Sequence, residues 1–151
     1  MSSKRITDIP GLMYLWKYDN LYLAGQPAME SFPSIRDLGV KKIYNLRGAS
    51  EIDFLGEERA CKDLGIDYEN LPIVENGSLS SEACDKLSQK IEASSDDIHF
   101  IHCGSANRVA GWLMTYLTNY KGISMDDAIE IAENSGLSNP GFIEQAEALK
   151  K

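Results

Sequence analysis

The sequence is poor in cysteine and has no long apolar run. Only three cysteines occur in 151 residues, Cys61, Cys84 and Cys103. They cannot all pair within one chain, and their spacing matches no zinc motif. We therefore expect reduced thiols and no metal site. No stretch approaches the roughly 20 apolar residues that a membrane span needs, and the N-terminus lacks the apolar run of a signal peptide. We expect a cytoplasmic protein, although an exported form trimmed of its signal would have the same sequence.

Basic residues are also scarce. The 15 Lys and Arg are outnumbered by 23 Asp and Glu, which gives a net charge of −8. This balance argues against binding to nucleic acid or to an anionic membrane surface. A small anionic substrate remains compatible, because a local pocket can be positive on an acidic protein. The sequence also has no repeat, linker or nucleotide motif, so we expect one domain over residues 1–151 and no cofactor.

The chain instead shows an alternation of short strands and helices. Strands are predicted at 12–16, 20–24, 40–46, 68–74 and 98–102. Helices are predicted at 29–38, 51–64, 80–93, 109–120 and 124–134, with a last one from Asn139 onward. Ser80 or Ser81 is expected to cap the helix at 80–93, and Ser124 with Asp127 forms a predicted capping box. In the helix at 51–64, Ile52, Leu55, Arg59 and Ala60 fall on one face. The alternation predicts an α/β fold with a central, mostly parallel sheet flanked by helices, and ligands bind at the carboxyl ends of such strands.

One segment combines a buried strand end, a small loop and a helix start. Cys103 directly follows the strand at 98–102, and Arg108 opens the next helix; between them lie Gly104, Ser105, Ala106 and Asn107. We call residues 103–108 the anion loop. Small residues let successive N–H groups converge on an anion, and the helix N-terminus adds a positive dipole. The Arg108 guanidinium can hold two oxygens of a phosphate.

Cys103 lies at the base of this positive field. Such surroundings favour the thiolate, which is the nucleophilic form of cysteine. We therefore hypothesise that Cys103 is a nucleophile. The alternative is a buried apolar thiol at a strand end with Arg108 as an ordinary surface residue.

Three motifs resemble a known family. They are LAGQP at 23–27, IYNLR at 43–47 and HCGSANRV at 102–109. Together they resemble the bacterial phosphatase-like domain that occurs alone and in beta-lactamase-hydrolase-like proteins, a relative of the dual-specificity and tyrosine phosphatases. The resemblance covers about residues 21–136. It implies a dual-specificity phosphatase-like fold and hydrolysis of a phosphomonoester, in a phosphorylated small molecule or a phosphoprotein, with a phosphate-like or sulfate-like anion bound in the loop.

The resemblance also implies roles for individual residues. Cys103 would form a phosphocysteine, Arg108 would clamp phosphate oxygens, and His102 would brace the loop and support the thiolate. An acid on a preceding loop would protonate the leaving group. Glu75 is the best-placed carboxylate, since it lies 28 residues before Cys103 and directly after a predicted strand. A solvated loop acid is the alternative for Glu75.

Two further residues are expected to support the site. Arg47 ends a predicted strand, where it would either add positive charge to the rim or pair with Glu51. Gln26, in a Gly-Gln-Pro turn, is expected to pack under the anion loop.

The chain departs from the phosphatase pattern within the anion loop. Those enzymes separate Cys and Arg by five residues, whereas four lie between them here. Ala106 stands where glycine is usual, and Val109 stands where a hydroxyl residue is usual. Four is also the loop length of rhodanese-type sulfurtransferases. Three hypotheses follow: a cysteine-dependent phosphatase, a rhodanese-like sulfurtransferase that uses a Cys103 persulfide, and a non-catalytic module that binds a phospho-ligand.

Overall fold

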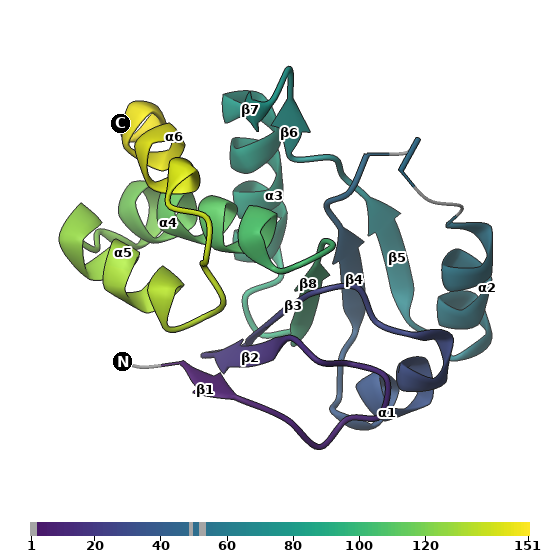
Figure 1. Cartoon of the computed structure of the whole chain (residues 1–151). Helices are drawn as coiled ribbons and strands as arrows, with labels where there is room; N and C mark the ends of the chain where they lie inside the picture. The colour runs from purple at the N-terminus through teal and green to yellow at the C-terminus, as the bar shows by residue number, and fades with distance from the viewer. Residues whose placement is uncertain (1–2, 49, 52–53) are drawn as a thin grey trace.

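A six-stranded sheet forms the centre of the molecule (Figure 1). The computed structural model describes residues 3–48, 50–51 and 54–151. The strands lie side by side in the order β1 (Lys4–Arg5), β2 (Leu15–Tyr18), β3 (Leu21–Ala24), β8 (His99–His102), β4 (Lys42–Asn45) and β5 (Asp67–Asn70). The last four are parallel, and β1 and β2 run antiparallel to their neighbours. The predicted α/β fold with a central, mostly parallel sheet is confirmed.

Helices cover both faces of this sheet. They are α1 (Phe32–Asp37), α2 (Leu55–Asp63), α3 (Ser81–Ala93), α4 (Asn107–Lys121), α5 (Met125–Glu133) and α6 (Gly141–Leu149). Figure 1 shows α1 and α2 on one side of the sheet and α3 to α6 on the other. A small hairpin of β6 (Val74–Glu75) and β7 (Ser78–Leu79) lies beyond the end of β5.

The sheet divides the core into two layers, because successive side chains of a strand point to opposite faces. Tyr22, Ile43 and Phe100 are paired in register and pack with α1 and α2. The next residues along each strand, Leu23, Tyr44 and Ile101, pack with α3 and α4. Every residue of β8 is buried, as predicted for a central strand covered on both faces. The packing on both faces holds β8 in place, and Cys103 is the residue that follows it.

Two helices begin at the serine caps that the sequence predicts. The hydroxyl oxygens of Ser80 and Ser124 accept the amides of Ala83 and Asp127, each at 3.2 Å, so both predicted caps are confirmed. No helix within residues 3–48, 50–51 and 54–151 is long and apolar enough to cross a membrane.

Other boundaries shifted. The helix predicted at 29–38 is a 3-10 turn, Met29–Ser31, followed by α1. The strand predicted at 68–74 ends at Asn70, and the hairpin begins only at Val74.

Only part of the expected apolar face of α2 packs against the core: Ala60 is partly buried against it, whereas Arg59 is exposed. Ile52 lies outside the described residues, and Leu55 is 67% exposed. The buried side chains of α2 are Glu57 and Cys61. Glu57 hydrogen-bonds to His102 at the end of β8, to Tyr68 in β5 and to Gln26 after β3. The apolar pattern alone does not predict these contacts.

Candidate active site

Cys103 lies at the carboxyl end of the central strand, immediately after His102. Its side chain is only 1% exposed. The neighbouring strands hold this end in place: the amide of Cys103 donates to the carbonyl of Ala24 at 3.2 Å, and the amide of Leu46 donates to the carbonyl of His102 at 2.8 Å. The backbone of Cys103 is therefore held by the neighbouring strands, at the edge of the sheet where the strands end and the loops begin.

The anion loop turns through Ala106. This residue has a φ of 73° and caps α4 in a left-handed conformation. A Cβ makes that conformation unfavourable by about 1–2 kcal/mol. Ala106 is fully buried, and its carbonyl accepts the amide of Ala110 at 3.0 Å. The chain thus makes this left-handed turn with an alanine.

Three backbone amides of the anion loop are available as donors. In the described part of the chain, no acceptor takes the amides of Gly104, Ser105 and Ala106. They precede the N-terminus of α4, whose first-turn amides and dipole also favour negative charge. The backbone supplies several donors at one place.

A close backbone contact fixes the other side of the loop. The amide of Gln26 donates to the carbonyl of Gly104 at 2.9 Å. A Cβ on Gly25 would lie 2.8 Å from the same carbonyl oxygen. Gly25 is therefore required for this approach, and Gln26 packs against the loop as the sequence predicted.

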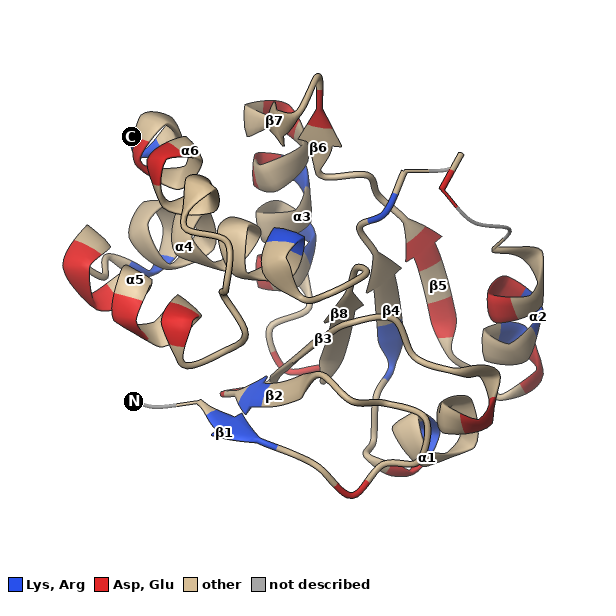
Figure 2. Ribbon diagram, viewed as in Figure 1, with Lys and Arg blue, Asp and Glu red and all other residues tan. Residues whose placement is uncertain are grey.

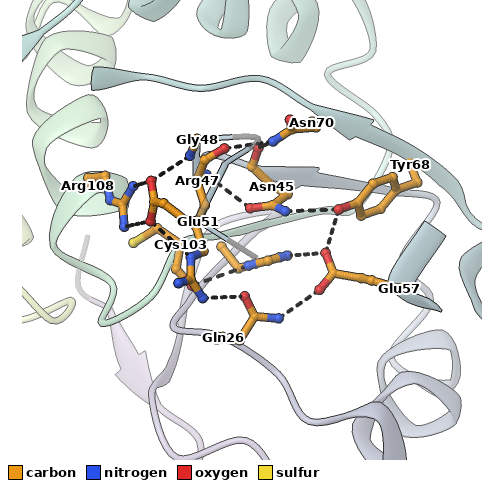
Figure 3. Close-up of polar contacts among 11 residues, drawn as sticks. Gln26, Asn45, Arg47, Gly48, Glu51, Glu57, Tyr68, Asn70, Cys103 and Arg108 are labelled. Atoms are coloured by element: carbon orange, nitrogen blue, oxygen red, sulfur yellow. Dashed lines mark hydrogen bonds and ion pairs between the residues drawn. The ribbon is translucent and has the colours of Figure 1, made fainter. Parts of the chain in front are cut away.

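Arg108 is held by the carboxylate of Glu51 (Figure 3). Nη1 lies 2.7 Å from Oε2, and Nη2 lies 2.9 Å from Oε1. The amide of Gly48 also donates to Oε2 at 2.7 Å, and Nε of Arg47 lies 3.3 Å from Oε1. The hydrogen bond from Arg108 is the largest of the effects that lower the pKa of Glu51 to about 2. Arg108 thus donates from both of its terminal nitrogens to a single carboxylate.

Arg47 and Arg108 border the loop together. A Cβ on Gly104 would lie 3.7 Å from Nη2 of Arg108 and 4.0 Å from Cζ of Arg47. Arg47 thus pairs with Glu51 and also lies beside Gly104 of the anion loop. Two cations share one carboxylate at this edge of an otherwise acidic protein. Figure 2 shows the acidic residues of α5 gathered on the opposite side of the molecule from α2.

A second carboxylate lies beneath the loop, and the sequence reasoning missed it. Glu57 is 5% exposed, and its Oε2 lies 2.8 Å from Nε2 of His102. Oε2 also accepts the hydroxyl of Tyr68 at 2.7 Å, and Oε1 accepts Nε2 of Gln26 at 2.7 Å. Burial acts to raise the pKa of Glu57, but the hydrogen bond and charge of His102, with the two other donors, outweigh it and lower that pKa.

The remaining loop side chains have structural contacts. Oδ1 of Asn107 accepts the amides of Ser138 and Asn139, each at 2.8 Å, so it ties the loop to the connection between α5 and α6. Nδ2 of Asn107 donates to the hydroxyl of Ser105 at 3.2 Å. Val109 is fully buried in the core.

Glu75 lies in the small hairpin. It is exposed in β6 and lines a hollow with Asn70, Pro72 and Lys86, and Cys103 is absent from the lining of that hollow. The structure therefore joins Cys103, Arg108, His102, Arg47 and Gln26 in one cluster.

No protein-family model and no curated protein sequence matches the chain. Solved structures do match it. A DUF442 protein of Shewanella putrefaciens CN-32 has a TM-score of 0.75 at 17% identity, with 93% of each chain covered. TpbA of P. aeruginosa, solved with phosphotyrosine, has a TM-score of 0.71 at 15% identity, covering 94% of this chain and 90% of its own. The kinase associated phosphatase, solved with its catalytic-site cysteine changed to serine, has a TM-score of 0.68 at 17% identity, with 85% and 83% covered.

At these identities the likenesses show the fold alone. They do not test the narrower resemblance to the domain of beta-lactamase-hydrolase-like proteins, which stays a prediction. The sheet order, the helices on both faces and the position of the loop agree with a single conclusion: the chain has the fold of the tyrosine and dual-specificity phosphatases.

Proposed function

We propose that this chain hydrolyses a phosphomonoester through a phosphocysteine on Cys103. The observation that carries the proposal is the bidentate contact of Arg108 with the Glu51 carboxylate, beside a buried cysteine at the carboxyl end of the central strand. Two oxygens of a phosphate present the same geometry to a guanidinium as two oxygens of a carboxylate. The side chain is therefore already arranged for the clamping role.

The reaction proceeds in two displacements. The Cys103 thiolate attacks phosphorus, so that an S–P bond forms and the bond to the leaving oxygen breaks; that oxygen takes a proton from a general acid. Water then attacks phosphorus, loses a proton, and displaces the thiolate, which releases inorganic phosphate. Arg108 and the amides of Gly104, Ser105 and Ala106 stabilise the charge on the phosphoryl oxygens in both steps.

The ion pair between Glu51 and Arg108 must break before a phosphate can bind both terminal nitrogens of Arg108. Glu51 is on the segment between β4 and α2, and its side chain is 34% exposed. Its contacts with Gly48 and Arg47 lie on the same segment. The carboxylate therefore acts as an internal competitor at the anion site.

An apolar hollow beside the loop makes an aryl phosphate a suitable probe. The hollow adjoins Gly104 and Gln26, and its wall carries the side chains of Ile9, Leu12, Met13 and Tyr14. Met13 and Tyr14 are 69% and 40% exposed. An aromatic leaving group would cover apolar surface here. The physiological substrate is proposed to be a phosphorylated small molecule or a phosphoprotein.

The test is hydrolysis of p-nitrophenyl phosphate by the reduced protein, alongside Cys103→Ser and Arg108→Lys. We expect turnover in the unaltered chain, complete loss in Cys103→Ser, and a loss of 100-fold or so in Arg108→Lys, because a lysine is a point charge that cannot bind bidentately. Turnover that persists in Cys103→Ser would refute the proposal.

Glu75 is proposed as the general acid. It is exposed in β6, so its substitution tests this role without disturbing the core. An acid matters most when the leaving oxygen is a poor leaving group. Glu75→Gln should slow hydrolysis of an alkyl phosphate far more than that of p-nitrophenyl phosphate, with Glu82→Gln as a control of equal charge. Equal effects on both substrates would remove Glu75 from this role.

The short loop supports sulfur transfer as a second candidate. Cys103 is almost fully buried, and a persulfide adds only one sulfur atom to it. The Cys103 thiolate would attack the outer sulfur of thiosulfate, so that a persulfide bond forms, the sulfur–sulfur bond of thiosulfate breaks and sulfite leaves. Thiosulfate treatment of the reduced protein should then increase the intact mass by one sulfur atom. An unchanged mass would exclude this candidate. Tight phosphate binding with neither reaction would instead favour a non-catalytic module, for which the apolar Val109 is the supporting feature.

A further inference from the structure

The buried ring of His102 faces an acceptor at both of its nitrogens. Nε2 lies 2.8 Å from Oε2 of Glu57, and Nδ1 lies 3.3 Å from the carbonyl oxygen of Cys103. An ionised carboxylate and a carbonyl oxygen can only accept hydrogen bonds, whereas a neutral imidazole has one donor and one acceptor. Both contacts are hydrogen bonds only when both ring nitrogens carry a proton.

Glu57 is itself surrounded by donors. The hydroxyl of Tyr68 donates to Oε2, because that hydroxyl already accepts Nδ2 of Asn45 at 2.9 Å. The amide of Gln26 donates to Oε1. With His102, three donors converge on one carboxylate, and Figure 3 shows Gln26, Asn45 and Tyr68 around it. The carboxylate is therefore the ionised partner of a buried ion pair.

We propose that Glu57 is a positioning residue for the anion loop, which holds His102 as a doubly protonated ring beneath the Cys103 peptide. This inference rests on the proposed function and deepens it. Nδ1 of His102 then donates to the Cys103 carbonyl and orients the first peptide of the loop. The positive charge of the ring lies next to the cysteine in the chain and favours its thiolate.

The same carboxylate orients a second support of the loop. The Gln26 amide donates to Glu57 through Nε2, and its Oε1 accepts Nη1 of Arg47 at 3.1 Å. These two partners fix which way the amide points, because the carboxylate only accepts and the guanidinium only donates. The backbone amide of Gln26 in turn holds the carbonyl of Gly104. Glu57 thus connects the base of the loop to its rim.

The charged and titratable groups that face this cluster come from four elements. Those on α2 and β5 surround the carboxylate, and those after β4 and on α4 surround the loop: Glu57, Cys61, Tyr68, Arg47, Glu51 and Arg108. Burial raises the pKa of Cys61 to about 12. Cys61 therefore stays a thiol when Cys103 reacts.

The test is the pH dependence of Cys103 alkylation by iodoacetamide, followed by peptide mass spectrometry in the full chain. Without the Glu57 carboxylate the His102 ring loses its second proton, and the loss of one nearby opposite charge shifts the titration of a thiol by about 1 pH unit. We expect Glu57→Gln to move the alkylation midpoint upward by about that amount, so that Cys103 reacts roughly tenfold more slowly below the midpoint. Glu57→Asp, which keeps the charge, should restore most of the lost rate. An unchanged midpoint in folded Glu57→Gln would overturn the proposal.

Two further measurements distinguish a positioning role of Glu57 from a purely structural one. Tyr68→Phe removes a hydrogen bond from the same cluster but keeps the Glu57 charge, so it should lower the melting temperature with little change in the midpoint. If Glu57→Gln does not fold, the nitrogen-15 shifts of the His102 ring in the unaltered protein decide: two protonated nitrogens at pH 7 support the proposal, and a neutral tautomer contradicts it. Neither measurement needs phosphatase turnover, so the failure of one proposal is distinguishable from the failure of the other.

Discussion

Glu51 and Arg108 form a bidentate ion pair, although 57 positions separate them in the sequence. The pair spans the mouth of the loop, with Cys103 at its base and Arg47 on the same side (Figure 3). The guanidinium that would hold the phosphate is therefore engaged by a carboxylate of the same chain. The first prediction follows from this relationship.

Glu51→Gln should tighten the binding of vanadate or phosphate. A partly exposed ion pair is worth no more than about 1 kcal/mol, so the gain is up to about fivefold. Vanadate inhibition of p-nitrophenyl phosphate hydrolysis, or calorimetric titration with phosphate, measures it. Glu58→Gln removes the same charge from an exposed position on α2 and serves as the control. Weaker vanadate binding in Glu51→Gln would mean that Glu51 positions Arg108 instead of competing for it.

The buried pair of Glu57 and His102 should make the free energy of unfolding depend on pH in the acidic range. The pKa of Glu57 is lowered in the folded chain from an ordinary value of 4.5. Its contribution is therefore complete above about pH 5 and is lost as the pH falls through 4.5 toward the lowered folded value.

Urea unfolding at pH 6 and at pH 3.5 measures this dependence. Glu57→Gln should be much less stable than the unaltered protein at pH 6, and the gap should narrow at pH 3.5. A gap of the same size at both values would show that the carboxylate charge does not contribute.

Gly25→Ala should disturb the loop from outside it. The new Cβ would approach the carbonyl of Gly104 to 2.8 Å. We expect a loss of about 1–3 kcal/mol in the free energy of unfolding, together with weaker phosphate binding, because the loop carbonyl must move.

Gly56→Ala is the matched control, since it makes the same change in α2, where the nearest atom is Cε of Met29 at 3.9 Å. Alanine is the better helix former, so this variant should be stabilised by up to about 1 kcal/mol. Equal effects of the two substitutions would contradict the close approach at Gly25.

The sheet and the anion loop were predictable from local signals. The apolar run at 98–102 identified the central strand, Cys103 and Arg108 marked the loop, and Ser80 and Ser124 marked helix starts. Each of these depends on residues within one turn or one strand. Periodicity and capping chemistry register such features directly.

The two carboxylates were not predictable in the same way. Glu57 meets His102 across 45 positions, and Glu51 meets Arg108 across 57. The apolar pattern of 51–64 assigned one face to Ile52, Leu55, Arg59 and Ala60, whereas the buried side chains of α2 include the charged Glu57. Only the position of α2 and the close ends of β4, β5 and β8 bring these groups together. An isolated acidic residue in a helix carries no local sign of such a partner.

The central claim is that Cys103 forms a covalent bond to phosphorus. The most direct measurement is acid quenching of the reduced protein during turnover of p-nitrophenyl phosphate, followed by mass spectrometry of the peptide that contains Cys103. The account predicts one phosphoryl group on Cys103, no adduct in Cys103→Ser, and no adduct on Cys61 or Cys84. Hydrolysis at full rate with no phosphoryl group on Cys103, or with the group on another residue, would contradict it.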